Sequence, residues 1–107
     1  MVREITVHEL QELIDNHAPF TLIDVREPHE VDIATIGGKL IPLGTITEQV
    51  LAFEPEASTV VVYCRSGKRS ATAIEQIQSL TGQTNLFNLQ GGILAWADAI
   101  DNTLTKY

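Results

Sequence analysis

Cysteine, methionine and tryptophan each occur once in this chain of 107 residues, and lysine and arginine together occur only seven times. A single cysteine cannot form a disulfide within the chain, so nothing in the sequence depends on an oxidising compartment. The cysteine and the three scattered histidines do not have the spacing of metal ligands. We therefore expect neither a bound metal nor a cofactor.

Long apolar runs are also missing. No segment has the length and hydropathy needed to span a bilayer, and residues 1–6 lack the hydrophobic stretch of a secretory signal. We therefore expect a soluble, cytoplasmic protein. The net charge of −7 also argues against nucleic acid and anionic membrane surfaces as binding partners.

Segments typical of strands and helices alternate along the chain, which fits a single domain of residues 1–107. Such alternation predicts right-handed crossovers and a parallel sheet with helices on both faces, an α/β fold. The expected strands are residues 20–25, 59–63 and 84–89. The expected helices are residues 7–16, 28–33, 46–53, 73–81 and 93–100, and the polar residues 101–107 are expected to fray. Thr6 and Glu9 match a capping box at the start of the first helix, and Gly82 is expected to end the fourth.

The cysteine stands where a buried strand is expected to turn into a helix. Cys64 directly follows the β-branched residues 59–63, and a polar, basic segment comes before the next helix. Backbone N–H groups of a tight loop and the positive end of a helix converge on the atom at the centre of such a loop. We therefore predict a lowered pKa for Cys64 and a nucleophilic thiolate near neutral pH. The alternative is that Cys64 is only a small core residue.

Positive charge gathers directly behind this cysteine. Arg65, Lys68 and Arg69 lie within five positions, and the rest of the chain carries −10, which is the total of −7 less these three positive charges. A local positive region on an acidic protein is typical of a site for a small anion. The alternative is a loop that is merely solvated. A basic loop has no packing purpose behind a core cysteine, so its presence favours the functional interpretation of Cys64.

The first long strand ends near two further charged residues. Ligands of an open parallel sheet bind at its carboxyl edge, where both Asp24 and Cys64 are expected. We predict that Asp24 fixes the loop geometry through hydrogen bonds instead of acting as a general acid. Arg26 is predicted to brace the loop through bidentate bonds to a carboxylate such as Glu30, or to backbone carbonyls. A dyad of Cys64 with His29 is not expected, because the loop alone can stabilise a thiolate.

Three stretches together resemble the rhodanese-like sulfurtransferases. They are the loop C-R-S-G-K-R-S at residues 64–70, the strand L-I-D-V-R-E at residues 22–27, and L-Q-G-G at residues 89–92 followed by Trp96. All three fall in that family's order and spacing. One stretch departs from the usual form, because Thr35 and Gly37 stand where the family has a histidine and a proline. This departure puts the local turn in question.

The resemblance implies a three-layer α/β/α fold around a central parallel sheet, with sulfur carried as a persulfide on Cys64. It implies a small anionic sulfur donor, such as thiosulfate, or a protein that carries a persulfide. The residues implied to bind the donor are Arg65, Ser66, Gly67, Lys68, Arg69 and Ser70. Asp24 and Arg26 are implied to support the loop.

Two other functions remain open. A cysteine-dependent phosphatase or arsenate reductase needs the pattern C-x-x-x-x-x-R, but the residue six after Cys64 is Ser70, and Arg69 comes one place too early. A shorter loop encircles a smaller volume, which suits a single sulfur better than a phosphate. A non-catalytic rhodanese-like binding module is the third possibility, and loss of the cysteine would be its usual mark.

The loop and residues 40–44 also look similar to the rhodanese domain of adenylyltransferases that activate ubiquitin-like sulfur-carrier proteins in molybdopterin and thiamine biosynthesis. This similarity would make the chain one domain of a longer enzyme, with a sulfur-carrier protein as its acceptor. Standalone bacterial rhodaneses share much the same loop.

Overall fold

The computed structural model describes residues 2–49 and 59–107. Within these residues, five strands form one sheet in the order β1-β5-β4-β2-β3, and every neighbouring pair is parallel. The strands are β1 (Arg3–Ile5), β2 (Thr21–Asp24), β3 (Lys39–Leu40), β4 (Val60–Tyr63) and β5 (Leu86–Leu89). The parallel sheet that the alternating pattern predicts is therefore confirmed, and the carboxyl ends of its strands meet at one edge.

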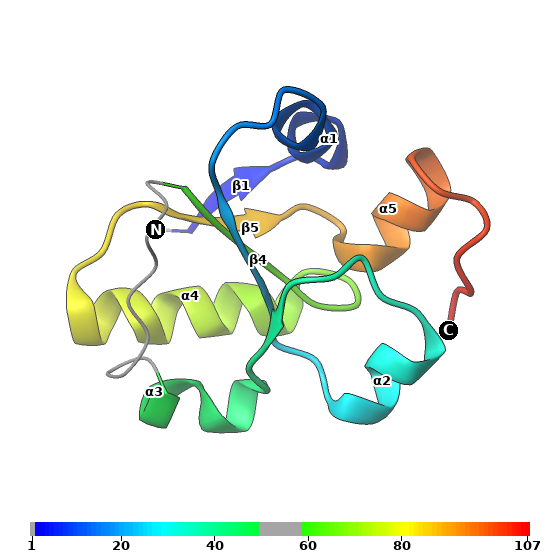
Figure 1. The fold of residues 1–107 in the computed structure, drawn as a ribbon. Coiled ribbons are helices and arrows are strands. Elements are labelled where there is room, and N and C mark those ends of the chain that lie inside the picture. The colour runs from blue at the N-terminus through cyan, green and yellow to red at the C-terminus, as the bar shows by residue number, and fades with distance from the viewer. Residues whose placement is uncertain (1, 50–58) are drawn as a thin grey trace.

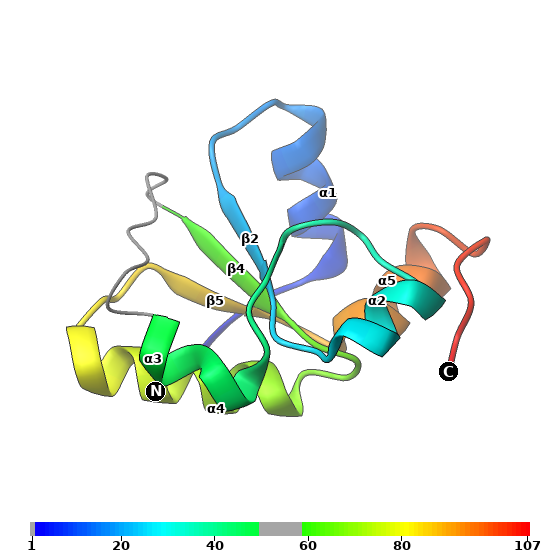
Figure 2. The ribbon, with the colours of Figure 1, turned by 60° about the horizontal axis from the view of Figure 1, so that its bottom comes forward.

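Helices cover both faces of the sheet (Figures 1 and 2). They are α1 (Val7–Asp15), α2 (Pro28–Ile33), the 3-10 helix η1 (Leu43–Thr45), α3 (Ile46–Gln49), α4 (Lys68–Thr81) and α5 (Gly92–Ala99). One hydrophobic cluster joins the sheet to α3 and α4, and a second joins it to α1 and α5. This arrangement is the predicted three-layer α/β/α fold.

Local sequence signals account for several element boundaries. Thr6 and Glu9 form the expected capping box, in which the Thr6 hydroxyl accepts from the Glu9 amide at 3.1 Å and the Glu9 carboxylate accepts from the Thr6 amide at 2.9 Å. Gly82 ends α4 in the left-handed conformation, with a φ of 73°. All four residues of β4 are 0% exposed, which explains why this strand reads as a continuous apolar run.

Some elements differ from the sequence interpretation. The short strands β1 and β3 lie at the two edges of the sheet and were not predicted, because two or three residues are too few to show a period. The helix expected at residues 46–53 is seen as Ile46–Gln49, and its remaining residues lie outside the described residues. Among the residues that the structure describes, no helix combines the length and hydropathy needed to span a membrane.

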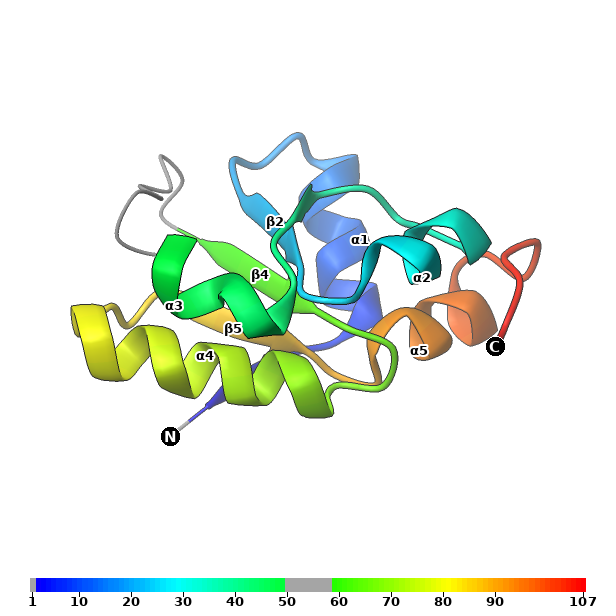
Figure 3. The same cartoon turned by 90° about the horizontal axis from the view of Figure 1, so that it is seen from below.

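The expectation that residues 101–107 fray is wrong. Leu104 and Tyr107 pack against the hydrophobic cluster beneath α1 and α5. The Tyr107 hydroxyl also forms hydrogen bonds with Arg26 and Glu30. The C-terminal segment, red in Figure 3, consequently runs back beside α5 and α2. A polar stretch is held here by tertiary contacts of its apolar residues.

Candidate active site

Residues 64–70, which connect β4 to α4 and include the first turn of α4, are called the Cys64 loop below. Cys64 follows the last residue of β4, and Gly67 turns the chain into α4 with a φ of 108°. The Cys64 sulfur accepts hydrogen bonds from the amides of Gly67, at 3.1 Å, and Ser70, at 3.4 Å. The predicted convergence of loop amides on this sulfur is therefore confirmed. Cys64 is nevertheless only 1% exposed, which the sequence did not reveal.

Two opposing influences act on the ionisation of Cys64. Burial is the largest single influence and raises the pKa of the thiol, because a buried charge loses hydration. Hydrogen bonds from the Ser70 hydroxyl and from the amides of Ser70, Gly67 and Ser66 favour the thiolate. Together these hydrogen bonds outweigh burial, and the pKa of Cys64 lies below its ordinary value. The loop thus stabilises an anionic sulfur in a nearly closed position.

The first turn of α5 binds the backbone of the Cys64 loop. The amide of Ile93 donates to the Cys64 carbonyl at 3.0 Å, and the amide of Leu94 donates to the Arg65 carbonyl at 3.2 Å. Gly92 lies between them with a φ of +62°, and a Cβ atom there would be 2.5 Å from both carbonyl oxygens. Only a residue without a Cβ atom allows this close approach. This contact fixes the backbone of Cys64 from the side opposite α4.

Asn88 of β5 belongs to the site, although the sequence interpretation missed it. It is 4% exposed, and its side-chain amide donates to the Gly67 carbonyl at 3.1 Å. Its carboxamide oxygen accepts a short hydrogen bond from the Ser70 hydroxyl. The available signal was a polar residue inside an otherwise apolar strand. Asn88 connects the middle of the Cys64 loop to its last residue.

Asp24 and Arg26 bind each other at the end of β2. Arg26 is 0% exposed, and its Nε and Nη2 donate to the Asp24 carboxylate at 3.0 and 2.8 Å. The Arg26 amide also donates to Asp24 Oδ1, at 3.0 Å. Glu30 offers Arg26 only its backbone carbonyl, at 3.4 Å. The expected carboxylate partner is thus Asp24 and not Glu30.

The Glu30 carboxylate instead pairs with Arg69 of the Cys64 loop. Arg69 Nη1 and Nη2 donate to the two carboxylate oxygens at 2.6 and 2.8 Å. These hydrogen bonds from Arg69, together with those from the Glu27 amide and Tyr107, outweigh burial and lower the pKa of Glu30 to about 2. The pair ties the first turn of α4 to α2. Arg69 therefore has a protein partner that the sequence interpretation did not foresee.

The other basic residues of the loop face outward. Arg65 and Lys68 are exposed, and the Arg65 guanidinium lies 5.2 Å from the centre of the Tyr107 ring. His29 is also exposed, on α2, and no hydrogen bond joins it to Cys64 in the described part of the chain. The site therefore contains the predicted cysteine and basic residues but no Cys64–His29 dyad.

The turn that departs from the family's usual form is held by Tyr63. The Tyr63 hydroxyl lies 2.7 Å from the Gly37 carbonyl oxygen and 2.9 Å from Asp24 Oδ2. Burial raises the pKa of Tyr63 to about 12, so this hydroxyl keeps its proton. Gly37 and Gly38 both adopt positive φ angles, of 92° and 95°. The altered turn is thus anchored to the same network as Asp24 and Arg26.

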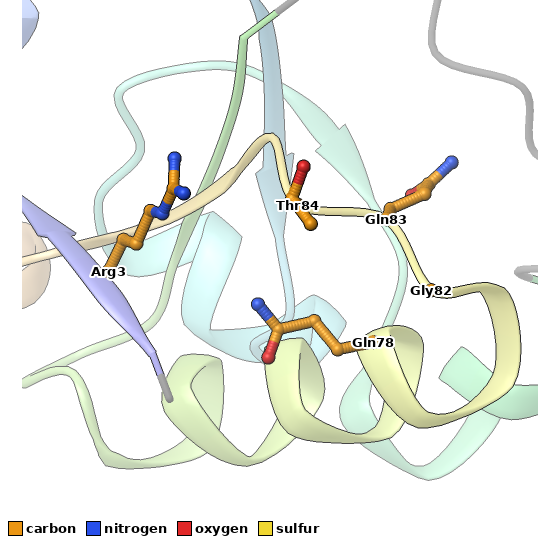
Figure 4. A pocket seen from close by; sticks show the side chains of 5 residues that line it. All are labelled: Arg3, Gln78, Gly82, Gln83 and Thr84. Atoms are coloured by element: carbon orange, nitrogen blue, oxygen red, sulfur yellow. The ribbon is translucent and has the colours of Figure 1, made fainter.

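A hollow of about 350 Å³ lies at a different place, beside the C-terminal end of α4 (Figure 4). Its lining residues are Arg3, Gln78, Gly82, Gln83 and Thr84. None of these belongs to the Cys64 loop, and none is a nucleophile. This hollow is therefore not an extension of the cysteine site.

Comparison with known proteins agrees with this geometry. Residues 6–99 match the sequence model of the rhodanese-like domain. The chain belongs to this family. This rhodanese-like domain is 40% identical over 105 residues to the probable adenylyltransferase/sulfurtransferase MoeZ of Mycobacterium tuberculosis, covering 96% of the chain but only 26% of MoeZ. The chain therefore spans about a quarter of the length of that relative.

Shorter relatives match the domain over almost their whole length. A sulfurtransferase of Allochromatium vinosum is 35% identical over 98 residues, which cover 91% of this chain and 90% of that protein. The crystal structure of a rhodanese-related protein from Thermoplasma volcanium aligns with a TM-score of 0.76 and 31% identity, over 90% of this chain and 91% of that one. These similarities confirm the fold and support a sulfurtransferase type of enzyme.

Proposed function

We propose that this rhodanese-like domain transfers a sulfane sulfur from a donor to an acceptor through a persulfide on Cys64. The observation that carries the proposal is the pair of amides, from Gly67 and Ser70, that point at the Cys64 sulfur. They lower the pKa of a thiol that burial alone would keep protonated. A structural core cysteine needs no such donors.

With thiosulfate as donor, the reaction has two balanced halves. The Cys64 thiolate attacks the outer sulfur of thiosulfate, the S–S bond of the donor breaks, and sulfite leaves with the bonding electron pair. The persulfide that forms carries the negative charge on its outer sulfur. An acceptor nucleophile then attacks this outer sulfur, and the Cys64 thiolate leaves as the S–S bond of the persulfide breaks. No external oxidant or reductant is required.

The loop residues have different roles in this proposal. The amides of Ser66, Gly67 and Ser70 stabilise negative charge on sulfur. Arg65 and Lys68 are exposed and attract an anionic donor from solution. Their neighbour Arg69 forms an ion pair with Glu30 and so fixes the start of α4. The Asp24–Arg26 pair supports the adjacent loop after β2 without touching the donor.

The geometry does not favour a phosphatase. Such an enzyme would need an arginine at the sixth residue after the cysteine, and this position holds Ser70, which is 0% exposed and faces the sulfur. Arg69 uses Nη1 and Nη2 to bind Glu30 instead of presenting them to a phosphate. A non-catalytic binding module is disfavoured because Cys64 and the amides around its sulfur are all present.

The similarity to MoeZ suggests one class of acceptor. If this domain works beside an adenylyltransferase, the outer sulfur of the persulfide would attack the adenylated C-terminal carbonyl of a ubiquitin-like sulfur-carrier protein, and AMP would leave. Two equivalents of a thiol reductant would then cleave the acyl disulfide, release the carrier thiocarboxylate and restore the Cys64 thiolate. The exposed residues Arg65, Ser66 and Lys68 would then face that acceptor. A persulfide-carrying protein could replace thiosulfate as the donor, with the same chemistry at Cys64.

A steady-state assay tests the proposal. The protein is supplied with thiosulfate and cyanide, and thiocyanate formation is followed in parallel with hydrolysis of an aryl phosphate. We expect thiocyanate to form and the aryl phosphate to remain intact. Hydrolysis of the phosphate without thiocyanate formation would support the phosphatase, and no turnover of either substrate would support the binding module.

A further inference from the structure

The orientation of the Asn88 side chain is fixed by the group it faces. The Gly67 carbonyl can only accept a hydrogen bond, so the Asn88 atom 3.1 Å from it must be the Nδ2 donor. The carboxamide oxygen then necessarily faces the Ser70 hydroxyl. Because this oxygen cannot donate, Ser70 has to donate to it. The two neighbours of Asn88 thus determine the direction of one proton in the site.

The Ser70 hydroxyl has only one proton and three acceptors within reach. The Gly67 carbonyl lies 3.2 Å from its oxygen, the Cys64 sulfur lies 3.4 Å away, and the Asn88 oxygen is the closest of the three. When Ser70 donates to Asn88, its oxygen can only accept from the sulfur side. This arrangement suits a protonated Cys64, whereas donation from the Ser70 hydroxyl to the sulfur, at 3.4 Å, suits a thiolate. A thiolate would instead need the Ser70 proton for itself.

We propose that Asn88 is a positioning residue that competes with the Cys64 sulfur for the Ser70 proton and so favours the thiol over the thiolate. The loop amides and Asn88 then act in opposite directions on the same sulfur. The amides of Gly67 and Ser70 stabilise its negative charge, and Asn88 weakens the further stabilisation that the Ser70 hydroxyl gives when it donates to the sulfur. Asn88 and the amides therefore shift the thiol–thiolate equilibrium of Cys64 in opposite directions.

Other charged groups face the sulfur from the surrounding elements. Arg69 of α4 interacts electrostatically with Cys64 while it pairs with Glu30 of α2. Arg65 and Lys68 extend into solvent from the loop itself. Because the Asn88 side chain carries no charge, replacing it leaves the charges of Arg69, Arg65 and Lys68 in place. A change in the Cys64 titration can then be assigned to the Ser70 proton.

The enzyme that carries the Cys64 persulfide differs from the free enzyme in its need for the Ser70 hydroxyl proton. This consequence rests on the proposed function. In a persulfide the negative charge moves to the outer sulfur, so the Cys64 sulfur no longer requires the Ser70 proton. Donation from Ser70 to Asn88 therefore does not destabilise the persulfide, whereas it destabilises the free Cys64 thiolate. Asn88 would thus shift the equilibrium between thiosulfate and sulfite toward the persulfide.

The test compares Asn88→Leu with the wild type, each with Ser70 and with Ser70→Ala. The pKa of Cys64 is measured from the ultraviolet absorbance of the thiolate and from the pH dependence of iodoacetamide alkylation. With Ser70 present, we expect Asn88→Leu to lower the pKa of Cys64 by about 1, because the closest competing acceptor is gone and the sulfur competes only with the Gly67 carbonyl for the hydroxyl proton. In the Ser70→Ala background we expect Asn88→Leu to have no effect.

The opposite results would overturn the proposal. A purely structural role predicts that loss of Asn88 loosens the loop, raises the pKa, and does so with or without Ser70. If Asn88→Leu does not fold, Asn88→Ala supports the same comparison without adding volume. A thermal melt of each variant verifies that the pKa is measured on folded protein.

This measurement does not depend on sulfur transfer. A wild type that forms no thiocyanate would end the proposed function but leave the pKa comparison intact. If sulfur transfer occurs, the persulfide fraction in a thiosulfate and sulfite mixture gives a second result. We expect this fraction to fall in Asn88→Leu relative to the wild type, and an unchanged or higher fraction would contradict the effect on the loaded state.

Discussion

Helices α4 and α5 begin in the same way but are capped by different atoms. Each follows a strand of the sheet, each has a glycine with positive φ at its N-cap, Gly67 or Gly91, and neither N-cap has a side chain to accept from the first turn. At α4 the amides of Gly67 and Ser70 meet the Cys64 sulfur. At α5 the first amides meet the backbone carbonyls of Cys64 and Arg65. Cys64 therefore contributes to the N-terminal caps of both helices.

The two caps have different roles: the sulfur at the start of α4 can react, and the carbonyls at the start of α5 only fix the backbone. A carbonyl oxygen keeps one state at all pH values, so the start of α5 fixes the backbone of Cys64 permanently. A sulfur atom can lose a proton or gain a second sulfur, so the start of α4 responds to the state of the site. The amides at α4 are already in position before either event, which is the condition for electrostatic stabilisation without reorganisation.

Cys64→Ser makes the strongest change to the cap of α4. A serine hydroxyl keeps a hydrogen-bond acceptor for the loop amides but cannot carry a sulfane sulfur. We expect thiocyanate formation from thiosulfate and cyanide to fall at least about 10³-fold. We also expect the free energy of unfolding to change by less than about 1 kcal/mol. A serine variant with undiminished turnover would show that Cys64 does not carry the sulfur.

Gly92→Ala disturbs the start of α5 instead. The new Cβ would lie 2.5 Å from the carbonyl oxygens of both Cys64 and Arg65, at a φ of +62°. We expect a loss of about 3 kcal/mol or more in the free energy of unfolding, measured by urea denaturation. Sulfur transfer should also fall, because the Cys64 backbone must move.

Gly82→Ala is the matched control for this substitution. Gly82 has a similar φ of +73°, but nothing lies within 4 Å of its potential Cβ. We expect a smaller loss, of about 1 kcal/mol, from the left-handed conformation alone, and unchanged sulfur transfer. Equal losses in the two variants would indicate that the contact between α5 and the Cys64 loop does not restrict this position.

Glu30→Gln loosens the start of α4 by weakening its bond to Arg69. The folded-state pKa of Glu30, about 2, lies below its ordinary value of 4.5. The stabilisation from the ionised carboxylate is therefore complete above about pH 4.5 and is lost as the pH falls from 4.5 toward 2. We expect the variant to be about 1–2 kcal/mol less stable at neutral pH.

Urea midpoints measured from pH 2 to pH 7 test this effect. The wild type should lose stability across the acid range, and Glu30→Gln should lose less across the same range because the group that titrates is gone. Parallel curves for the two proteins would show that Glu30 does not contribute to acid sensitivity.

Arg65→Ala and Lys68→Ala should have the smallest effects. Both side chains are exposed, and their proposed role is long-range attraction of the donor, so we expect each variant to raise the KM for thiosulfate about two- to five-fold with little change in kcat. Added salt should raise the KM of the wild type more than that of either variant. A KM that does not respond to ionic strength would count against both residues as donor-attracting groups.

Local patterns were sufficient to predict the parts of the fold that local physics controls. The capping box at Thr6, the buried strand before Cys64 and the glycine stop at Gly82 each depend on residues within a few positions. The convergence of loop amides on Cys64 also follows from a strand, a glycine and a helix in immediate succession. These features needed no knowledge of distant parts of the chain.

Several of the missed features join residues that are far apart in sequence. Tyr107 contacts Arg26 across 81 positions, Arg69 pairs with Glu30 across 39, and Ser70 reaches Asn88 across 18. No period or motif records such pairings. The partner of Arg26 was also missed, because both Asp24 and Glu30 offer it a carboxylate and the sequence does not show that Glu30 pairs with Arg69.

Intact mass spectrometry of the protein after incubation with thiosulfate tests the central claim most directly. A thiolate at the cap of α4 should take up one sulfur atom, so the mass of the wild type should rise by that amount and return to its starting value after cyanide treatment. The Cys64→Ser variant should gain nothing. A wild type whose mass stays unchanged at saturating thiosulfate, while its fold is intact, would contradict sulfur transfer from thiosulfate through Cys64.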